Sequence, residues 1–288
     1  MLSLDRVSKT YKTGTFGGTD LFAVRDVSFE VEPGEVVSLI GESGSGKSTI
    51  GKMILRLTPV TEGSISFGGL DVSRLGRRPL RDYYRRVQGV FQDPFSSYNP
   101  IFKADRVFSL LKDTYFPHVG GAEWRQKIDA ALEAVCLDPP AVLGKYPHQL
   151  SGGQLQRLLI ARALLLDIEF LVVDEIISML DASTRIDVLN LLGDLKARGL
   201  GILFITHDLS LGNYISDKTV ILRRGSIVEM GATERVFGNP LHPYTRMLLA
   251  SVPQLHRKWE PFEIEPEPGN GAPPKLVEVE AEHLVRVA

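Results

Sequence analysis

A glycine-rich segment at residues 41–48 reads GESGSGKS and has the residue types of a phosphate-binding loop. It follows the apolar run 36–40 and precedes a stretch, 49–55, with helical spacing. Its glycines would let backbone N–H groups turn around a polyphosphate, while Lys47 can reach the β- and γ-phosphates and the Ser48 hydroxyl can bind Mg²⁺. The start of the helix would add the positive end of its dipole. We therefore predict a nucleoside triphosphate site formed by Gly41, Glu42, Ser43, Gly44, Ser45, Gly46, Lys47, Ser48 and Thr49.

Two adjacent carboxylates supply the chemistry that a phosphate loop lacks. A site that cleaves its nucleotide needs a second ligand for Mg²⁺ and a group that orients water. Asp174 and Glu175 follow four apolar residues, 170–173, which read as a buried strand. Ligands bind beyond the C-terminal ends of strands in open α/β sheets. We predict that Asp174 contacts Mg²⁺ through water and that Glu175 polarises the attacking water.

Gln92 and His207 also follow expected strands, at 86–91 and 201–206. The neutral amide of Gln92 can both donate and accept, so it could sense the metal and the γ-phosphate. His207 could hydrogen-bond the γ-phosphate and the water. A single histidine at a strand end more commonly has a structural role, so the prediction for His207 depends on the residues around it.

A second anion-binding motif begins at Ser151 and continues with Gly152, Gly153 and Gln154. A hydroxyl and free backbone N–H groups at the start of a helix attract a phosphate. One nucleotide does not need two such cradles on one chain, unless the second serves the nucleotide of a neighbouring molecule. The motif therefore predicts a head-to-tail dimer with the nucleotide between the subunits.

Composition limits the class of protein. The 288 residues are 43% apolar and 24% charged with a net charge of −2, so nothing attracts the whole chain to nucleic acid or anionic lipid. The single cysteine, Cys136, excludes an intrachain disulfide or a cysteine-rich metal site, and its apolar helical surroundings predict a small core residue. We see no secretory signal and no apolar membrane span, and expect a cytosolic chain that reaches a membrane by docking to another protein.

The order of expected elements predicts an α/β fold. Strand-like alternation over the first thirty or so residues gives an N-terminal antiparallel β part, and strands alternating with helices around the phosphate loop and beyond residue 170 give a P-loop NTPase core with a mostly parallel sheet. Residues 101–166 read as an inserted helical subdomain. The domain is expected to cover 1–255, and 256–288, rich in glutamate and proline, is expected to be extended or disordered.

Together these motifs resemble the ATP-binding subunit of ABC transporters, over about residues 1–255. The resemblance implies ATP and Mg²⁺ as cofactors. It implies that Tyr11 stacks on adenine and that Ser151 and Gly153 touch the γ-phosphate bound to the partner subunit. It also implies that Asp181 communicates between the two sites.

Two further segments indicate which branch of this family the chain resembles. Residues 91–100, FQDPFSSYNP, and 239–246, NPLHPYTR, look like the oligopeptide/dipeptide importer branch, whose relatives also carry nickel or short oligosaccharides. Read alone, the HPY triplet is equally a helix start, because proline is favoured in a first turn. Members of the family usually place Pro-Thr or a similar pair after the glutamate. Here Ile176 and Ile177 follow it, which changes the stiffness of the backbone there.

The resemblance implies an ATP-hydrolysing subunit of a membrane importer, located at the cytoplasmic face of the cell membrane. The expected partners are a second ATP-binding subunit, either a related chain or a copy, two membrane permease subunits and an external solute-binding protein. Permease helices are expected to sit near Gln92 and the helical subdomain. The imported solute, whether peptide, oligosaccharide or nickel, stays open at this point.

Two other functions have some support in the sequence. A soluble nucleic-acid-linked ATPase has some support in residues 74–86, where arginines and tyrosines could bind phosphates and stack bases. Such a run is more often a solvated helix face, and the second cassette, coiled coils or zinc cysteines of such relatives are absent, so we expect no nucleic-acid partner. A regulatory subunit that does not hydrolyse ATP is favoured slightly by residues 176–177 and opposed by Glu175 and His207.

Overall fold

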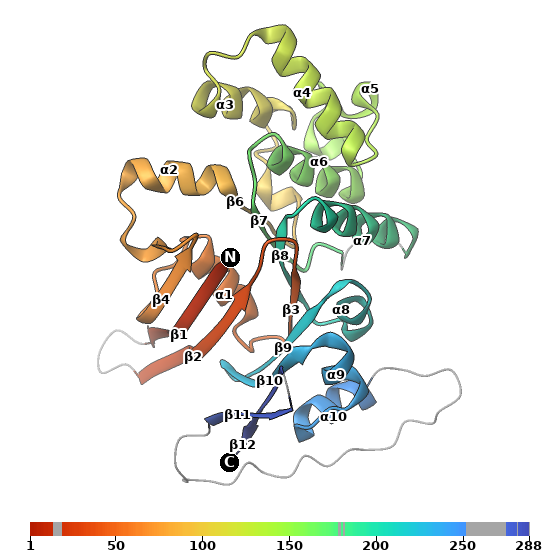
Figure 1. Ribbon diagram of the computed structural model, residues 1–288. Helices are drawn as coiled ribbons and strands as arrows, with labels where there is room; N and C mark the ends of the chain where they lie inside the picture. Colours follow the sequence, from red (N-terminus) through yellow and green to blue (C-terminus); the bar gives the residue numbers. More distant parts are fainter. Residues whose placement is uncertain (14–18, 178–179, 181, 252–274, 281, 288) are drawn as a thin grey trace. The chain divides into compact units, whose positions relative to one another are not determined.

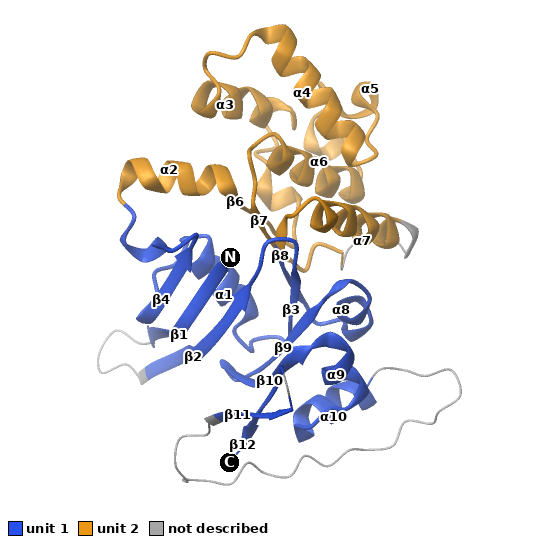
Figure 2. Cartoon of the chain, viewed as in Figure 1, with its two compact units in different colours: residues 1–75, 202–288 blue, residues 76–201 orange. Residues whose placement is uncertain are grey.

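The structure is a computed structural model that describes residues 1–13, 19–177, 180, 182–251, 275–280 and 282–287 (Figure 1). The chain divides into two compact units (Figure 2). Unit 1 contains residues 1–75 and 202–288, and unit 2 contains residues 76–201.

The N-terminal sheet of unit 1 is antiparallel, as predicted. Its strand order is β2-β1-β4-β5, with bounds β1 (Leu2–Thr13), β2 (Thr19–Val31), β4 (Glu62–Phe67) and β5 (Leu70–Asp71). Leu2 lies opposite Val31 and Leu4 opposite Phe29, and all four side chains are buried. The alternation read from the sequence therefore places one face of this sheet against a core.

The second sheet of unit 1 carries the phosphate loop. Its central strand β3 (Val36–Ile40) pairs in parallel with β8 (Gly201–Thr206) and β9 (Lys218–Arg223), and β10 (Ser226–Ala232) pairs antiparallel with β9. Every residue of β3 and β8 is buried, as expected for parallel strands covered on both faces. The helices of this unit are α1 (Lys47–Ile54), α8 (Leu209–Ile215), α9 (Thr233–Gly238) and α10 (Pro243–Ala250).

Unit 2 combines a parallel strand pair with helices. Strand β6 (Val87–Val90) pairs in parallel with β7 (Phe170–Asp174). The helices are α2 (Arg77–Arg86), α3 (Arg106–Tyr115), α4 (Gly121–Ala134), α5 (Pro139–Val142), α6 (Gly152–Leu164) and α7 (Ala182–Ala197). Short 3₁₀ turns lie in both units at η1 (Val72–Arg74), η2 (Phe95–Ser97) and η3 (Pro147–Gln149). Helices α3 to α6 lie within the stretch that the sequence predicts as helical.

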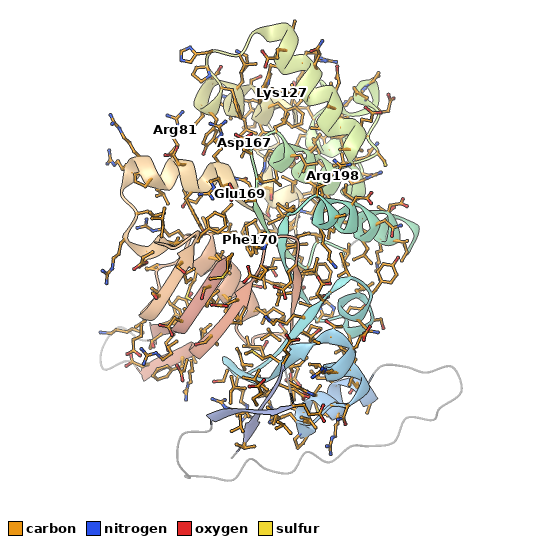
Figure 3. The ribbon with its side chains drawn as sticks, viewed as in Figure 1. Arg81, Lys127, Asp167, Glu169, Phe170 and Arg198 are labelled. Atoms are coloured by element: carbon orange, nitrogen blue, oxygen red, sulfur yellow. The ribbon has the colours of Figure 1, made fainter. Side chains whose placement is uncertain are left out.

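Arginines of α2 bind groups within unit 2. Glu169 stands directly before Phe170 at the start of β7 (Figure 3) and accepts two hydrogen bonds of 2.6 Å from the Arg86 guanidinium. This contact lowers the pKa of the Glu169 carboxyl. Arg85 pairs with Asp167 at 2.5 Å, and Arg81 donates to the backbone carbonyl of Thr114. Part of the arginine-rich stretch therefore makes contacts within unit 2.

Cys136 is exposed, so its prediction as a core residue was wrong. Helix α4 ends at Ala134, and Cys136 follows in a left-handed conformation with φ 53°. The helical apolar period of α4 does not continue through this turn, which is why the pattern did not fix the burial of the thiol.

The C-terminal residues form a hairpin in the second sheet of unit 1. Strand β11 (Lys275–Glu280) pairs antiparallel with β12 (His283–Val287), which pairs with β10. His283 and Val285 are buried. The segment 256–288 was expected to be extended or disordered. Residues 275–280 and 283–287 within it form paired strands, because β10 supplies a pairing partner from earlier in the chain. Residues 252–274 lie outside the described residues.

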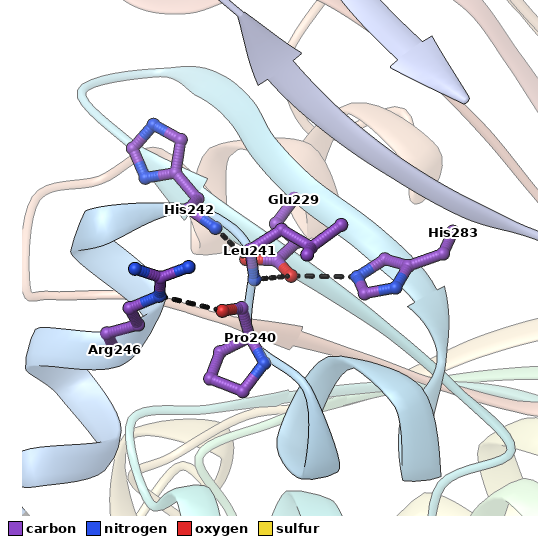
Figure 4. A network of polar contacts seen from close by, with 6 residues as sticks. All are labelled: Glu229, Pro240, Leu241, His242, Arg246 and His283. Carbon is purple, nitrogen blue, oxygen red and sulfur yellow. Dashed lines mark hydrogen bonds and ion pairs between the residues drawn. The ribbon is translucent and has the colours of Figure 1, made fainter. Parts of the chain in front are cut away.

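One buried carboxylate joins three parts of this region (Figure 4). Glu229 of β10 is fully buried, and its Oε1 accepts a hydrogen bond of 2.8 Å from the Leu241 N–H. The same oxygen lies 2.8 Å from Nε2 of His283 in β12. Its Oε2 accepts a bond of 2.9 Å from the His242 N–H. Glu229 therefore fixes both the C-terminal hairpin and the segment that leads into α10.

We expect Glu229→Gln to lower the free energy of unfolding by about 2 kcal/mol, because the new amide nitrogen must face one of two buried backbone N–H groups. Urea unfolding followed by circular dichroism measures this loss. The same change at exposed Glu32 is the control and should alter stability by less than about 0.5 kcal/mol. Identical midpoints for the two variants would disprove the role given to this carboxylate.

Candidate functional site

The loop after β3 encloses a lysine. Gly46 has φ 105°, and a Cβ there would lie 2.4 Å from the Ala23 carbonyl oxygen. A Cβ at Gly41 would lie 2.1 Å from the Leu222 carbonyl oxygen. No residue with a side chain fits at either position, so both glycines are required for the chain to make this turn.

Lys47 begins α1 and is buried, with 4% of its surface exposed. Its Nζ donates to the carbonyl oxygens of Gly41 at 2.7 Å and Glu42 at 2.8 Å. The ammonium group therefore lies inside the turn, next to the N-terminal end of a helix, where an anion is favoured. Ser48 and Thr49 follow on the first turn of α1 and are half-buried.

The remaining loop residues lie around this lysine. Glu42, Ser43 and Gly44 are exposed, whereas Ser45 is buried. The Ser45 carbonyl accepts a hydrogen bond of 2.9 Å from the Gly225 N–H, in the turn between β9 and β10. The nine residues predicted for the phosphate loop therefore form a turn, at 41–46, and the first three residues of α1, with Glu42, Ser43 and Gly44 exposed.

His207 leaves the same sheet edge as this loop. Ile40 pairs with Thr206 in the parallel ladder of β3 and β8, so the residues that follow each of them emerge side by side. His207 is exposed, and the neighbouring Asp208 caps α8 by accepting from the N–H groups of Ser210 and Leu211. The cap fixes the backbone next to the histidine.

Tyr11 presents a partly exposed ring on β1. It lies opposite Leu21 of β2, and the Lys9 ammonium lies 5.0 Å from the centroid of its ring. An exposed aromatic face of this kind can stack on a planar base. The structure places Tyr11 in unit 1, together with the loop and His207.

Asp174, Glu175 and Gln92 leave one edge of the strand pair in unit 2. Val90 pairs with Val173, so the segments that follow β6 and β7 emerge together. Asp174 is buried and Gln92 is exposed. Glu175 has φ 50°, a left-handed conformation that is uncommon for residues other than glycine. Several other non-glycine residues share this conformation, Cys136 among them, so it does not by itself indicate function.

Ser151 and Gln154 form a reciprocal cap at the start of α6. The Ser151 hydroxyl accepts from the Gln154 N–H at 3.2 Å, and the Gln154 side-chain oxygen accepts from the Ser151 N–H at 2.9 Å. The side chain of Gln154, predicted to help bind the nucleotide, thus has a local role in shaping this turn. A Cβ at Gly153 would lie 3.2 Å from Cγ2 of Thr184, whereas one at Gly152 would meet no atom within 4 Å. Packing within the described residues therefore does not explain the glycine at 152.

Helix α6 also supports the segment that carries Gln92, through residues that sequence reasoning missed. The side-chain amide of Gln156 donates to the Phe91 carbonyl at 3.4 Å, and Arg162 donates to the Gly89 carbonyl at 3.0 Å. Both residues are polar positions on an otherwise buried, apolar helix, which is the signal that could have indicated them. Burial lowers the pKa of the Arg162 guanidinium.

The predicted site residues therefore belong to two groups. Unit 1 holds Tyr11, the phosphate loop and His207, and unit 2 holds Gln92, the motif at 151–154 and the pair Asp174 and Glu175. Asp181 lies outside the described residues. None of the helices that could be assessed has the length and apolarity required to cross a membrane.

Comparison with known proteins identifies the family. Residues 24–178 match the family described as ABC transporter, and residues 228–278 match the family described as oligopeptide/dipeptide transporter, C-terminal region. A putative peptide import ATP-binding protein of Brucella ovis is 44% identical over 255 residues, covering 88% of this chain and 78% of that protein. The oligopeptide transport ATP-binding protein OppF of Bacillus subtilis is 42% identical over 233 residues, covering 80% and 76%.

This chain is also similar to a solved structure of an ATP-binding cassette. The ATP-binding cassette MJ0796, in a dimeric post-hydrolysis state bound to ADP and phosphate, is 30% identical and superposes with a TM-score of 0.73 over 81% of this chain and 99% of that one. The predicted α/β fold is thereby confirmed. With its phosphate loop, its matched residues and these identities, the chain belongs to the ABC transporter family.

Proposed function

We propose that this chain is the ATP-hydrolysing subunit of a membrane importer for oligopeptides or dipeptides. The observation that carries the ATP-dependent part is the turn at 41–49, with the Lys47 ammonium enclosed by carbonyl groups at the start of a helix. The peptide class rests on the match of residues 228–278 to the C-terminal region of oligopeptide/dipeptide transporters, and on relatives that are named for peptide import.

In this proposal each residue group has a defined task. Lys47 exchanges its carbonyl partners for the β- and γ-phosphates, and Tyr11 stacks on adenine. Glu175 polarises the attacking water, and His207 hydrogen-bonds that water and the γ-phosphate.

The residues assigned to Mg²⁺ fit a hard cation. Ser48, Gln92 and Asp174 all offer oxygen atoms. Among the described residues, no cluster of three His, Cys, Asp or Glu side chains could hold an ion without other ligands. Mg²⁺ in nucleotide sites is usually bound by one or two carboxylates together with phosphate oxygens, so a cluster of several acidic ligands is not required. When bound, the ion neutralises the charge that develops on the phosphates.

The motif at 151–154 acts on the nucleotide of a second ATP-binding subunit. The Ser151 hydroxyl is exposed at the N-terminal end of α6, where the helix favours an anion, and open space surrounds a Cβ placed at Gly152. Such space is useful if the backbone must approach a phosphate closely. Contacts to the γ-phosphate from both subunits stabilise only the closed dimer, so ATP shifts the population toward it and hydrolysis reopens it.

Permease helices dock on the surface after Gln92. Three large apolar side chains there are exposed, namely Phe95, Ile101 and Phe102. They belong to the same segment as Gln92, so a helix packed on them would move with the residue that senses the γ-phosphate. This arrangement connects nucleotide state to the membrane part of an importer.

We expect Glu175→Gln to reduce steady-state ATP hydrolysis about 100-fold or more, since the amide cannot accept a proton from water. ATP-dependent dimerisation, measured by analytical ultracentrifugation, should persist because the phosphate loop is intact. Glu133→Gln, at an exposed site on α4, should leave both properties unchanged. Wild-type turnover in the Glu175 variant would refute its assigned role.

We expect Ser151→Ala and Lys47→Ala chains to be inactive separately and to regain ATPase activity when mixed, because one dimer then contains an intact loop and an intact motif on different subunits. Losing the helix cap costs about 1 kcal/mol, so thermal unfolding must show that the Ser151 variant is folded. Activity is followed by phosphate release. A mixture no more active than its parts would show that the two motifs do not cooperate between copies of this chain, and the same pair of variants would then be tested with a related ATP-binding subunit.

A further inference from the structure

A tyrosine from the C-terminal region reaches the phosphate loop. The hydroxyl oxygen of Tyr244, in α10, accepts a hydrogen bond of 3.2 Å from the backbone N–H of Glu42. Its ring is 1% exposed and lies in a buried cluster with side chains of β3, α8, β9, β10 and α9. The contact joins two segments that lie 202 residues apart in the sequence, within one unit.

Hydrogen bonds around the start of α10 set the position of the Tyr244 hydroxyl. Oε1 and Oε2 of Glu229 hold the N–H groups of Leu241 and His242, directly before α10 (Figure 4). Nδ1 of His242 accepts from the Tyr244 N–H at 3.1 Å, and the Arg246 guanidinium donates to the Pro240 carbonyl at 2.8 Å. The first turn of α10 is thus fixed on both sides of the tyrosine, and the ring has little freedom to move.

The loop needs this support most when it holds a nucleotide. In the structure, Lys47 binds the carbonyl groups of Gly41 and Glu42 and closes the start of the loop. A lysine that turns to phosphate oxygens gives up those two carbonyl groups. The Tyr244 hydroxyl comes from outside the loop and can keep its bond to the Glu42 N–H in both states.

The hydroxyl is more than a filler of the core. A phenylalanine would occupy the same buried volume without a polar atom, whereas a buried hydroxyl costs free energy unless it is hydrogen-bonded. Burial raises the pKa of Tyr244, so the group stays protonated and neutral beside the loop. The Arg223 guanidinium lies over the Tyr244 ring, 4.9 Å from its centroid.

We propose that Tyr244 is a positioning residue for the nucleotide site, and that its hydroxyl holds the first residues of the phosphate loop in the conformation that binds ATP. The proposal rests on the proposed role of that loop. By this proposal the C-terminal region that contains Tyr244 contributes to nucleotide binding. The hydrogen bonds from Glu229 to the start of α10, and from Tyr244 to Glu42, make the connection.

The test is Tyr244→Phe, compared with wild type and with Thr245→Val in the full chain. Thr245 is the next residue of α10 and is equally buried, and its hydroxyl has no hydrogen-bond partner among the described residues. Titration with Mg-ATP gives the dissociation constant. Phosphate release gives KM and kcat, and thermal unfolding with and without Mg-ATP gives the stabilisation by ligand.

For Tyr244→Phe we expect the dissociation constant and KM to rise about five-fold, the factor that corresponds to one hydrogen bond of about 1 kcal/mol. The kcat should change less than about two-fold, because the variant leaves the groups that act on water intact. Melting without nucleotide should fall only slightly, because a loop that holds no phosphate can relax around the lost bond, while the upward shift with Mg-ATP shrinks. Thr245→Val should match wild type in all four measurements.

Equal ATP affinity in wild type and Tyr244→Phe would overturn the proposal and leave Tyr244 as a core residue. A loss of stability without nucleotide, with kcat reduced as much as affinity, would also overturn it, since a merely structural role predicts that pattern. Failure of the wild-type chain to bind Mg-ATP would instead overturn the proposed function of the loop itself, so the two failures are distinguishable.

Discussion

The enclosure of the Lys47 ammonium by the turn after β3 is the constraint on which the rest of the site depends. The chain can make this turn only because Gly41 and Gly46 approach the carbonyl groups of Leu222 and Ala23 more closely than any side chain would allow. Those two carbonyls belong to β9 and β2, so both sheets of unit 1 shape the loop. A local motif of nine residues therefore requires the packing of the whole unit to become a binding site.

Local patterns were sufficient to predict much of the fold and of the candidate site. The buried runs of β3 and β7 were visible as continuous apolar stretches, and the Gly-rich turn between a strand and a helix is a pattern with a physical cause. The cap between Ser151 and Gln154 likewise involves residues three positions apart. In each case the interactions that decide the structure are close in sequence, and reasoning over short windows can find them.

Contacts between distant segments were beyond such reasoning. The acidic, proline-rich composition of 256–288 concealed a hairpin that is ordered by pairing with β10 and by the contact of His283 with Glu229. The HPY triplet could be read as a helix start, and it is one, because His242 caps α10. Its second role, the bond from Tyr244 to the loop, depends on how α10 packs on the sheet. A sequence window around 244 contains no information about residue 42.

The predicted site residues are divided between the two units, and this division suggests how ATP binding and hydrolysis could be coupled to transport. Unit 1 carries the groups proposed to hold the nucleotide, and unit 2 carries Glu175, Gln92 and the motif at 151–154, with α6 bonded to the backbone before Gln92. The most direct measurement is a structure of the Glu175→Gln protein with Mg-ATP and its partner subunit. We expect the γ-phosphate to contact Lys47 of one subunit and the motif at 151–154, or its equivalent, of the other. If Lys47 contacts the γ-phosphate but the motif at 151–154 of neither subunit lies near it, the mechanism is contradicted.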